Sequence, residues 1–269
     1  MLETDTRSPL GTYRLTGVDH ALYAMAQGFG RGRLRFKLGL AMRKLVLRHK
    51  RIVDADPLGI RCRFYPQENL GDRFVLFTPG YYEHEERELL PQILRDDSVF
   101  VDIGANTGFY SLYAARFITG PKGRILAFEP NPVMFDRFKL NIAFNGLESR
   151  IEALPIGLAD REGEFDLSYD PRQLGGASMA VDGGPVHVKV PCRPLLDLLR
   201  EKEVAAITVL KIDVEGFEAN ILNPFFAAAP RSLFPEHVII ESAAGIDWVG
   251  LGYRFQKRTH AHNSIFSPA

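Results

Sequence analysis

The residues best suited to chemistry lie in one short stretch, Val99–Tyr110, which reads VFVDIGANTGFY. A compact apolar run ends there at Asp102 and Gly104, and a helical stretch begins directly afterwards. Glycine lets the backbone approach a ligand closely and present its N–H groups at the start of a helix. In an open α/β sheet, ligands bind just outside the carboxyl ends of such strands. The stretch therefore predicts a ligand site.

Two classes of cofactor could bind at this turn. A dinucleotide site places glycines at relative positions one, three and six, counted here from Gly104. The third position is Asn106 and the sixth is Phe109, and both side chains would crowd a pyrophosphate. The sequence therefore disfavours a nicotinamide-dependent oxidoreductase. An adenosyl sulfonium ligand has no phosphate and needs no such clearance.

The next predicted strand, Arg124–Phe128, is followed directly by a carboxylate, Glu129. An ionised carboxylate only accepts hydrogen bonds, so Glu129 can take both ribose hydroxyls of an adenosyl group. Asp102 can accept from the ammonium group of the same ligand, directly or through water. Acidic residues at the position of Glu129 also serve NAD enzymes, so the prediction rests on Glu129 and the Asp102 turn together.

Three motifs together resemble the FkbM family of S-adenosylmethionine-dependent methyltransferases. They read VDIGANTG from Val101, LAFEPN from Leu126 and LKIDVEGFE from Leu210. The resemblance extends from about Tyr82 to the end of the chain and includes Asn141–Gly146. It implies a class I, Rossmann-like methyltransferase fold with S-adenosylmethionine as cofactor. It also implies O-methylation of a hydroxyl on a sugar, glycan or polyketide-type metabolite, so the expected partner is a small-molecule or glycan acceptor.

The predicted cofactor site draws on four parts of the sequence. Tyr82-Glu83 stands where family members often carry Tyr-Glu, so Glu83 is expected to cap the cofactor or acceptor cleft. The alternative for Glu83 is an ordinary carboxylate at a helix start. The whole predicted set is Glu83, Asp102, Gly104, Ala105, Asn106, Thr107, Gly108, Glu129, Pro130, Asn131 and Asp213.

The predicted catalytic residues lie at the ends of two later strands. Lys211, Asp213 and Glu215 alternate, so they would face one side if the strand stayed extended. Methyl transfer depends on positioning the acceptor, and a nearby base helps when the acceptor is a hydroxyl. Asp213 is the first choice, and Glu241 closes the neighbouring strand. The alternatives are an internal ion pair between Lys211 and Asp213, and glutamates that only favour a helix start.

Metal and disulfide chemistry receive less support. Asp213, Glu215 and Glu241 offer hard oxygen ligands suited to Mg²⁺, which leaves a magnesium-dependent reaction open, although no resident metal is predicted. Cys62 and Cys192 are the only cysteines and form no C-x-x-C pair, so neither a disulfide partner nor a cysteine zinc site is expected.

The elements that must position these residues follow a regular rhythm from Ser98 onwards. Short apolar strands alternate with helical stretches, which predicts a doubly wound, mostly parallel α/β sheet. An acidic stretch from Glu83 to Glu88 is expected to be followed by a helix into Leu94. Further helices are expected after Gly104 to about Phe117 and from about Pro132 to Phe144. The remaining strands are predicted at Ile151–Leu154, Val209–Ile212 and His237–Ile240, with an insertion near Glu164–Tyr169 and Val186–Val190 and a last antiparallel pair at Tyr253–Lys257 and Asn263–Phe266.

The chain divides by its patterns into residues 1–79 and 80–269. The first part is an expected α+β extension, and the second is the expected methyltransferase domain. Two short β-like runs in the extension, Arg61–Tyr65 and Arg73–Phe77, are separated by turn-forming residues and predict a hairpin-like pair.

The charge of the chain is balanced overall, at 33 basic and 33 acidic residues, but not locally. Nine of the basic residues lie between Arg31 and Arg51 with no acidic residue among them. Interleaved apolar residues predict a basic amphipathic helix, interrupted at Gly39, that could bind an anionic membrane surface, a nucleic acid or an acidic partner. The alternative is a solvated cationic face on a helix packed against an acidic domain.

This basic segment keeps two other functions open. A basic arm could hold RNA phosphates, which would make the protein an RNA methyltransferase. The fold could also be a catalytically silent, methyltransferase-like binding module that works through the basic helix. The start of the chain is polar, and no stretch approaches the roughly 20 apolar residues that span a bilayer, so a cytoplasmic location is expected.

Overall fold

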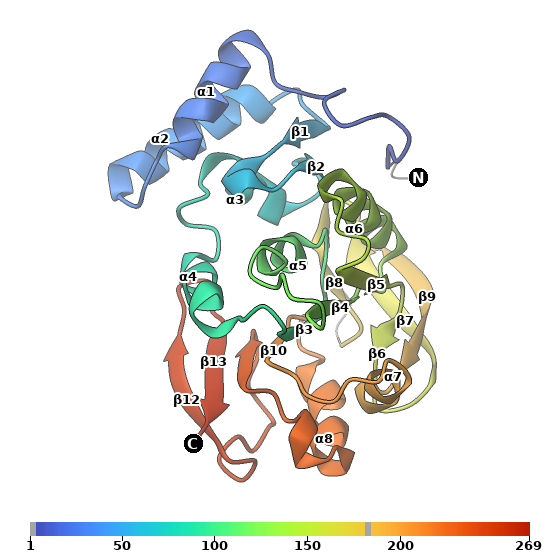
Figure 1. Cartoon of the computed structure of the whole chain (residues 1–269). Coiled ribbons are helices and arrows are strands. Elements are labelled where there is room, and N and C mark those ends of the chain that lie inside the picture. Colours follow the sequence, from blue (N-terminus) through green and yellow to red (C-terminus); the bar gives the residue numbers. More distant parts are fainter. Residues whose placement is uncertain (1–3, 181–183) are drawn as a thin grey trace.

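A computed structural model describes residues 4–180 and 184–269. Its centre is a seven-stranded sheet with the order β12-β13-β11-β10-β3-β4-β5, in which only β13 runs against the other strands (Figure 1). This confirms the predicted mostly parallel sheet and its last antiparallel pair. The strands are β3 (Val99–Ile103), β4 (Arg124–Phe128), β5 (Ile151–Leu154), β10 (Val209–Ile212), β11 (His237–Ile240), β12 (Tyr253–Arg258) and β13 (Ser264–Pro268).

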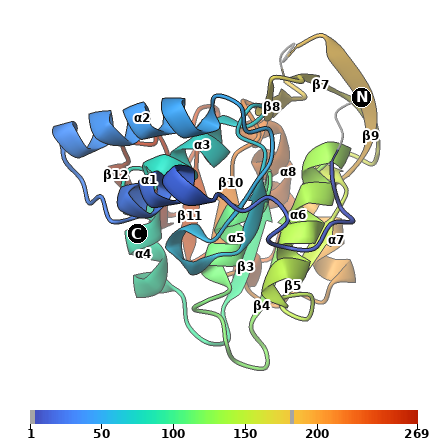
Figure 2. The same cartoon turned by 90° about the horizontal axis from the view of Figure 1, so that it is seen from above.

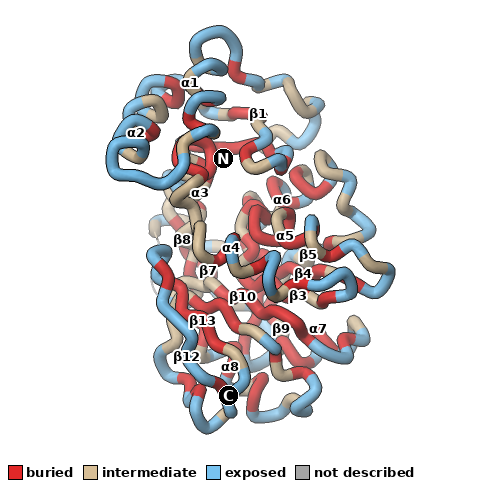
Figure 3. Tube along the Cα trace, turned by 60° about the vertical axis from the view of Figure 1, so that its left-hand side comes forward, coloured by how far each residue is buried: buried red, intermediate tan, exposed pale blue. Residues whose placement is uncertain are grey.

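The central strands are buried on both faces, which explains their continuous apolar sequences. Phe100 of β3 packs into one hydrophobic cluster, and its neighbour Val101 packs into a second cluster on the opposite face. Buried residues run along most of the central strands in Figure 3. Cys62 and Cys192 are buried as free thiols in different clusters.

Helices cover both faces of the sheet. The cluster that holds Phe100 includes side chains of α4 (His84–Ile93), α5 (Phe109–Ala114) and α6 (Pro132–Asn145). The opposite cluster includes side chains of α7 (Leu195–Glu201) and α8 (Glu218–Ala228), which is followed by the short turn η2 (Arg231–Leu233). The doubly wound architecture is therefore confirmed.

The ends of α6 follow from local sequence. The side chain of Asn131 accepts a hydrogen bond from the backbone N–H of Val133 (3.0 Å), and Pro132 occupies the first turn. Gly146 ends the helix in the left-handed conformation, with φ of +67°. An asparagine cap, a first-turn proline and a terminal glycine each suit the position that they occupy.

The insertion between β5 and β10 forms a second sheet, with the order β6-β9-β7-β8. Its longer strands confirm the predicted alternating segments. One backbone hydrogen bond, from Leu174 to the carbonyl of Glu68 (2.8 Å), joins this sheet to the N-terminal extension. The strands are β6 (Gly157–Leu158), β7 (Gly163–Asp170), β8 (Gln173–Ser178) and β9 (Val186–Arg193).

Within residues 4–79, the N-terminal extension forms three α-helices and one small hairpin. The elements are α1 (Gly17–Gln27), α2 (Arg33–Leu47), β1 (Val53–Ala55), the turn η1 (Pro57–Gly59), β2 (Cys62–Phe64) and α3 (Leu70–Phe77). The predicted strand at Arg73–Phe77 is wrong, because this segment is the end of α3. Asn69 caps that helix by accepting from the N–H of Gly71 (2.9 Å), and Asp72, Val75 and Leu76 are buried at helical spacing. The strand β2 therefore pairs with β1 instead.

The predicted interruption of the basic helix at Gly39 is also wrong, since α2 continues through this residue. Gly39 lies where α2 crosses the end of α3, and a Cβ atom there would come within 2.5 Å of the carbonyl oxygen of Phe77. The glycine therefore allows close helix packing. Figure 2 shows α2 at the outer edge of the extension, beside α1 and α3.

The extension packs directly on the sheet. Phe64 and Phe77 belong to the same hydrophobic cluster as Phe109 and Phe138 of the second part of the chain. The backbone N–H of Arg63 donates to the side chain of Asn141 in α6 (2.9 Å). The two parts of the chain therefore share one core. No helix within the described residues is long and apolar enough to cross a membrane.

Candidate functional site

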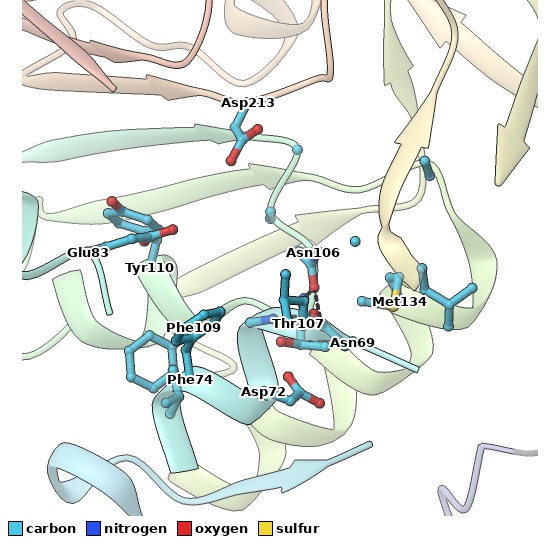
Figure 4. Close-up of a pocket in the computed structure, with 18 of the residues that line it drawn as sticks. Asn69, Asp72, Phe74, Glu83, Asn106, Thr107, Phe109, Tyr110, Met134 and Asp213 are labelled. Carbon is cyan, nitrogen blue, oxygen red and sulfur yellow. Dashed lines mark hydrogen bonds between the residues drawn. The ribbon is translucent and has the colours of Figure 1, made fainter. Parts of the chain in front are cut away.

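A cavity of about 630 Å³ lies at the carboxyl ends of β3, β4 and β10 (Figure 4). Its volume falls in the range of sites that bind cofactors and small molecules. The sheet contributes one wall, from the loops after these strands. The extension, the segment before α4, the helices α5 and α6, the β7–β8 insertion and the loop between β12 and β13 also contribute residues.

The glycine turn after β3 is held by main-chain contacts. The N–H groups of Gly104 and Ala105 both donate to the carbonyl of Phe128 (3.0 Å each). Gly104 has φ of +76°, and a Cβ atom there would clash with the carbonyl oxygen of Asp213. At Gly108, with φ of +82°, a Cβ atom would clash with the ring of Phe138. Both glycines therefore allow close packing within the protein, and Gly104 also lines the cavity.

Glu129 lies on the cavity wall and fixes the turn. One carboxylate oxygen accepts from the N–H of Asn106 (2.6 Å), and the other accepts from the N–H of Asn131 (2.9 Å). Burial raises the pKa of Glu129 to about 7, although both backbone hydrogen bonds oppose the rise. Each carboxylate oxygen has a second lone-pair direction, so Glu129 can still accept from two ligand hydroxyls.

Asn106 connects this turn to the extension. Its backbone is left-handed, with φ of +55°, and its side-chain oxygen accepts from the N–H of Thr107 (2.8 Å). The same oxygen accepts from the side chain of Asn69 (2.8 Å), as the dashed line in Figure 4 shows. Sequence reasoning missed Asn69, because it was interpreted only as a turn-forming residue between two predicted strands.

Lys211 is buried at the floor of the cavity between two carboxylates. Its Nζ atom lies 3.2 Å from Asp213 and 4.0 Å from Asp102. Burial disfavours the charged amine, but the charges of Asp213, Asp102 and Glu83 outweigh that effect and raise the pKa of Lys211. Asp102 is fully buried, accepts from the hydroxyl of Ser111 (2.6 Å) and does not line the cavity. Lys211 and Asp213 therefore face the ligand space, with Asp102 behind them.

Glu83 lines the cavity beside Tyr110 (Figure 4). It precedes α4 in the left-handed conformation, with φ of +43°, and its side chain makes no capping hydrogen bond. Burial raises the pKa of Glu83 to about 8, and the charge of Asp213 adds to the rise while Lys211 opposes it. This geometry fits a ligand-facing carboxylate better than an ordinary helix-start residue.

The predicted group of Asp213, Glu215 and Glu241 does come together. Carboxylate oxygens of all three lie within 4.8 Å of one another. The strand β10 ends at Ile212, and Glu215 turns away with φ of +53°, so the expectation of one extended face fails beyond Asp213. Glu241 lines a second cavity of about 500 Å³, which it shares with Glu215. Burial, then the charges of Asp213 and Glu215, raises the pKa of Glu241 to about 8.

The remaining predicted residues divide into two groups. Ala105, Thr107 and Pro130 line the cavity with the residues already described. Gly108 and Asn131 do not line it, and instead begin α5 and α6. A cluster of three carboxylates is common without an ion, so the absence of a resident metal stays a prediction.

Sequence reasoning missed a group of aromatic residues on one side of the cavity, which we call the aromatic wall. It consists of Phe36 and Phe74 of the extension, Tyr81 and Tyr82 directly after it, and Phe109. The rings of Phe36 and Tyr81 lie 4.7 Å apart between centroids, and Tyr82 meets Phe109 edge to face at 5.4 Å. All four residues and Phe74 line the cavity. Sequence reasoning considered Phe109 only as a residue that would crowd a pyrophosphate, and Tyr82 only as the neighbour of Glu83.

The sheet order, the single reversed strand and the site after β3, β4 and β10 define a class I methyltransferase fold. A family model described as the methyltransferase FkbM domain matches residues 102–245, more than half of the chain. The chain therefore belongs to the FkbM methyltransferase domain family, as its motifs predicted, and is a methyltransferase.

Three relatives illustrate the range of this family. Methyltransferase sdnD of Sordaria araneosa is 33% identical over 64% of this chain and 74% of its own length. Hexuronic acid methyltransferase AglP of Haloferax volcanii is 29% identical over 61% of this chain and 64% of its own length. The 31-O-demethyl-FK506 methyltransferase FkbM of Streptomyces tacrolimicus is 28% identical over 55% of this chain and 65% of its own length.

Proposed function

We propose that this protein transfers a methyl group from S-adenosylmethionine to a hydroxyl oxygen of a sugar, glycan or polyketide-type acceptor. The observation that carries the proposal is Glu129, a buried carboxylate that lines the cavity beside the glycine turn. The names of two relatives, which specify a hexuronic acid and an O-demethyl substrate, support an oxygen acceptor of this kind.

The residues of the cavity fit the proposed cofactor. Glu129 would accept from the two ribose hydroxyls, and Glu83 would accept from the ammonium group. One carboxylate oxygen of Glu83 has no hydrogen-bond partner among the described residues, although it is buried, so it has an acceptor to offer. When bound, S-adenosylmethionine supplies a methyl group on a positively charged sulfur atom.

Asp213 is the proposed catalytic base. Lys211 donates to its Oδ2 atom (3.2 Å), which orients the carboxylate and leaves Oδ1 to take the proton of an acceptor hydroxyl. Glu241 would receive or return that proton, because its carboxylate lies within 4.8 Å of Asp213 and has a pKa of about 8. Glu215 would contribute negative charge beside the same pair. Each residue thus has one role in moving or holding a proton.

The aromatic wall is the proposed acceptor subsite. Phe36, Phe74 and Tyr81 present ring faces and edges, which pack well against sugar rings and other partly apolar metabolites. All three residues come from the N-terminal extension or from the segment that follows it. We therefore propose that residues 1–79 cap the domain of residues 80–269 and complete its acceptor site.

Calorimetric titration with S-adenosylhomocysteine tests the cofactor site. The wild-type protein should bind in the micromolar range, and Glu129→Ala should weaken binding about 100-fold, because two hydrogen bonds to a charged group are lost. The matched control is Glu152→Ala, a half-exposed carboxylate paired with Lys202 outside the cavity. Equal affinity in Glu129→Ala and wild type would contradict the proposed ribose contact.

Activity assays separate the acceptor classes. Folded protein that binds S-adenosylhomocysteine should methylate at least one hydroxyl compound, with or without added Mg²⁺. Methylation of RNA alone, with an affinity that falls steeply with salt, would favour the RNA methyltransferase. Failure of folded protein to bind S-adenosylhomocysteine would favour the catalytically silent binding module.

A further inference from the structure

The helix α2 has two different faces. Its inner face packs through Gly39, Val46 and Leu47, which are buried. Its outer face carries Leu34, Leu38 and Leu45, with 71%, 43% and 66% of their surfaces exposed. Spacings of four and seven residues place these leucines on one stripe of the helix. The stripe is therefore an apolar surface that the rest of the described chain leaves uncovered.

Exposed cations flank this stripe. Seven basic residues of the segment are exposed, and none of them forms an ion pair within the described residues. They are Arg31, Arg33, Arg35, Lys37, Lys44, Arg48 and Arg51. Of the other two, Lys50 pairs with Asp19 (3.2 Å), and Arg43 lies over the ring of Phe74. The outer face of α2 is thus both apolar and strongly positive.

This combination is concentrated at one end of the molecule. Eight large apolar side chains are exposed among the described residues, and five of them lie on α1 and α2. Besides the three leucines, these are Val18 and Met25 of α1. The two helices pack together at the outer edge of the extension (Figures 1 and 2). Such a patch on a soluble protein marks an interaction surface.

We propose that the outer face of α2 binds an anionic lipid surface. Cations alone would serve a nucleic acid or an acidic protein equally well. Phosphate groups of a nucleic acid, however, offer nothing to three exposed leucines, whereas a lipid surface accepts both kinds of side chain. Its headgroups attract the arginines and lysines, and its acyl boundary takes the apolar stripe.

The position of Phe36 connects this surface to the cavity. Phe36 belongs to α2 and lines the cavity against Tyr81, while Leu34 and Leu38 on either side of it point outward. Binding of α2 to a membrane therefore brings one wall of the cavity close to the lipid surface. The proximity of the cavity to the membrane favours an amphiphilic acceptor whose hydroxyl-bearing group extends from the membrane. This inference about the acceptor rests on the proposed function.

Vesicle co-sedimentation tests the proposal on the full-length protein. The wild type should bind vesicles with about 30% phosphatidylglycerol and should not bind pure phosphatidylcholine vesicles. Reversal of three charges, in Lys37→Glu/Lys44→Glu/Arg48→Glu, should weaken binding at least about 100-fold. Replacing the stripe, in Leu34→Gln/Leu38→Gln/Leu45→Gln, should weaken it about tenfold at physiological salt.

Matched controls separate a local surface from a general effect. Lys122→Glu/Lys139→Glu/Arg254→Glu reverses three exposed charges elsewhere, and Val249→Gln removes an exposed apolar side chain. Both controls should bind vesicles like the wild type, and circular dichroism should show that every variant is folded.

Two results would overturn the proposal. One is that the wild-type protein does not bind anionic vesicles, whether or not it binds RNA or an acidic protein. The other is a leucine variant that binds vesicles as tightly as the wild type. Binding of S-adenosylhomocysteine, measured on the same samples, reports separately on the proposed cofactor site. Failure of either idea can therefore be distinguished from failure of the other.

Discussion

The two walls of the cavity are built from opposite kinds of residue. The wall at the sheet carries charge, with Glu129 at the end of β4 and with Lys211 and Asp213 at the end of β10, on either side of β3. The wall from the extension is aromatic, with Phe36 and Phe74 on two helices that lie outside the sheet. The charged residues are held by hydrogen bonds and ion pairs. The aromatic residues are held by packing.

This difference indicates how one site can combine a fixed cofactor with a particular acceptor. Parallel strands end at the same edge of the sheet, so their terminal carboxylates meet wherever this fold forms. The extension and the sheet share one hydrophobic core, and hydrogen bonds also join them, among them the one between Asn69 and Asn106 (2.8 Å).

Removing the base on the charged wall should give the largest effect. Asp213→Asn should lower kcat by about 10²–10⁴-fold, because the neutral amide cannot accept the hydroxyl proton. Steady-state kinetics and S-adenosylhomocysteine titration would show whether kcat falls while cofactor affinity stays within about threefold. Asp160→Asn, an exposed carboxylate paired with Arg161, is the matched control. A kcat close to that of the wild type would remove Asp213 from the mechanism.

Removing the aromatic wall should affect the acceptor alone. Phe36→Ala/Phe74→Ala should raise the KM for the acceptor about 30-fold, since two aromatic contacts are lost. Cofactor affinity should stay unchanged. Phe255→Ala, which removes an exposed ring on β12, is the control. A comparable loss of cofactor affinity in the double variant would contradict the proposal that the aromatic wall binds only the acceptor.

The raised carboxylate pKa values should make cofactor binding depend on pH. Glu129 and Glu83, with pKa values of about 7 and 8, must be ionised to accept from the ligand. Affinity for S-adenosylhomocysteine should therefore rise by about 500-fold between roughly pH 6 and pH 8, of which about tenfold comes from Glu129. In Glu83→Gln, the part of the rise near pH 8 should disappear and the part near pH 7 should remain. A flat profile in the wild type would contradict both assignments.

The same pKa values predict the opposite trend for the unliganded protein. Because their folded-state pKa values are raised, these carboxylates favour folding in their protonated forms. Stability should therefore fall as the pH rises from about 4.5 through about 7 to 8. Urea unfolding of the free protein at several pH values would measure this trend.

Removing the hydrogen bond between Asn69 and Asn106, which joins the two walls, should give the smallest effect. Asn69→Ala removes the hydrogen bond to Asn106 and the cap of α3, so stability should fall by about 1–2 kcal/mol. Urea unfolding measures the loss. Gln256→Ala, which removes an exposed hydrogen bond to Ser267, should cost much less. If the two variants are equally stable, the hydrogen bond between Asn69 and Asn106 does not help to hold the extension to the sheet.

Local sequence predicted most of the sheet and much of its charged wall. The strands β3, β4 and β10 read as continuous apolar runs because both of their faces are buried. The carboxylates follow directly from the ends of those strands. The segment Arg73–Phe77 misled the prediction, because a short apolar run fits a strand and a buried helix equally well.

Other features of the site depended on contacts between distant segments. Gly39 was read as a helix breaker, although it provides space for the carbonyl of Phe77. Asp102 was expected at the ligand, but Lys211 lies in front of it. Neither outcome can be derived from spacing along the chain, since each depends on which elements pack against each other.

The sequence by itself determined the family, because three of its motifs resemble those of FkbM methyltransferases. It also determined the sheet and the carboxylates at the strand ends, because these follow from residue type and short-range periodicity. Only the tertiary structure decided that Phe36, Phe74 and Tyr81 form the second wall. It also decided which leucines of α2 are buried and which face outward. The physical reason is that a side chain's surroundings are set by the packing of whole elements, which residues far apart in the sequence establish together.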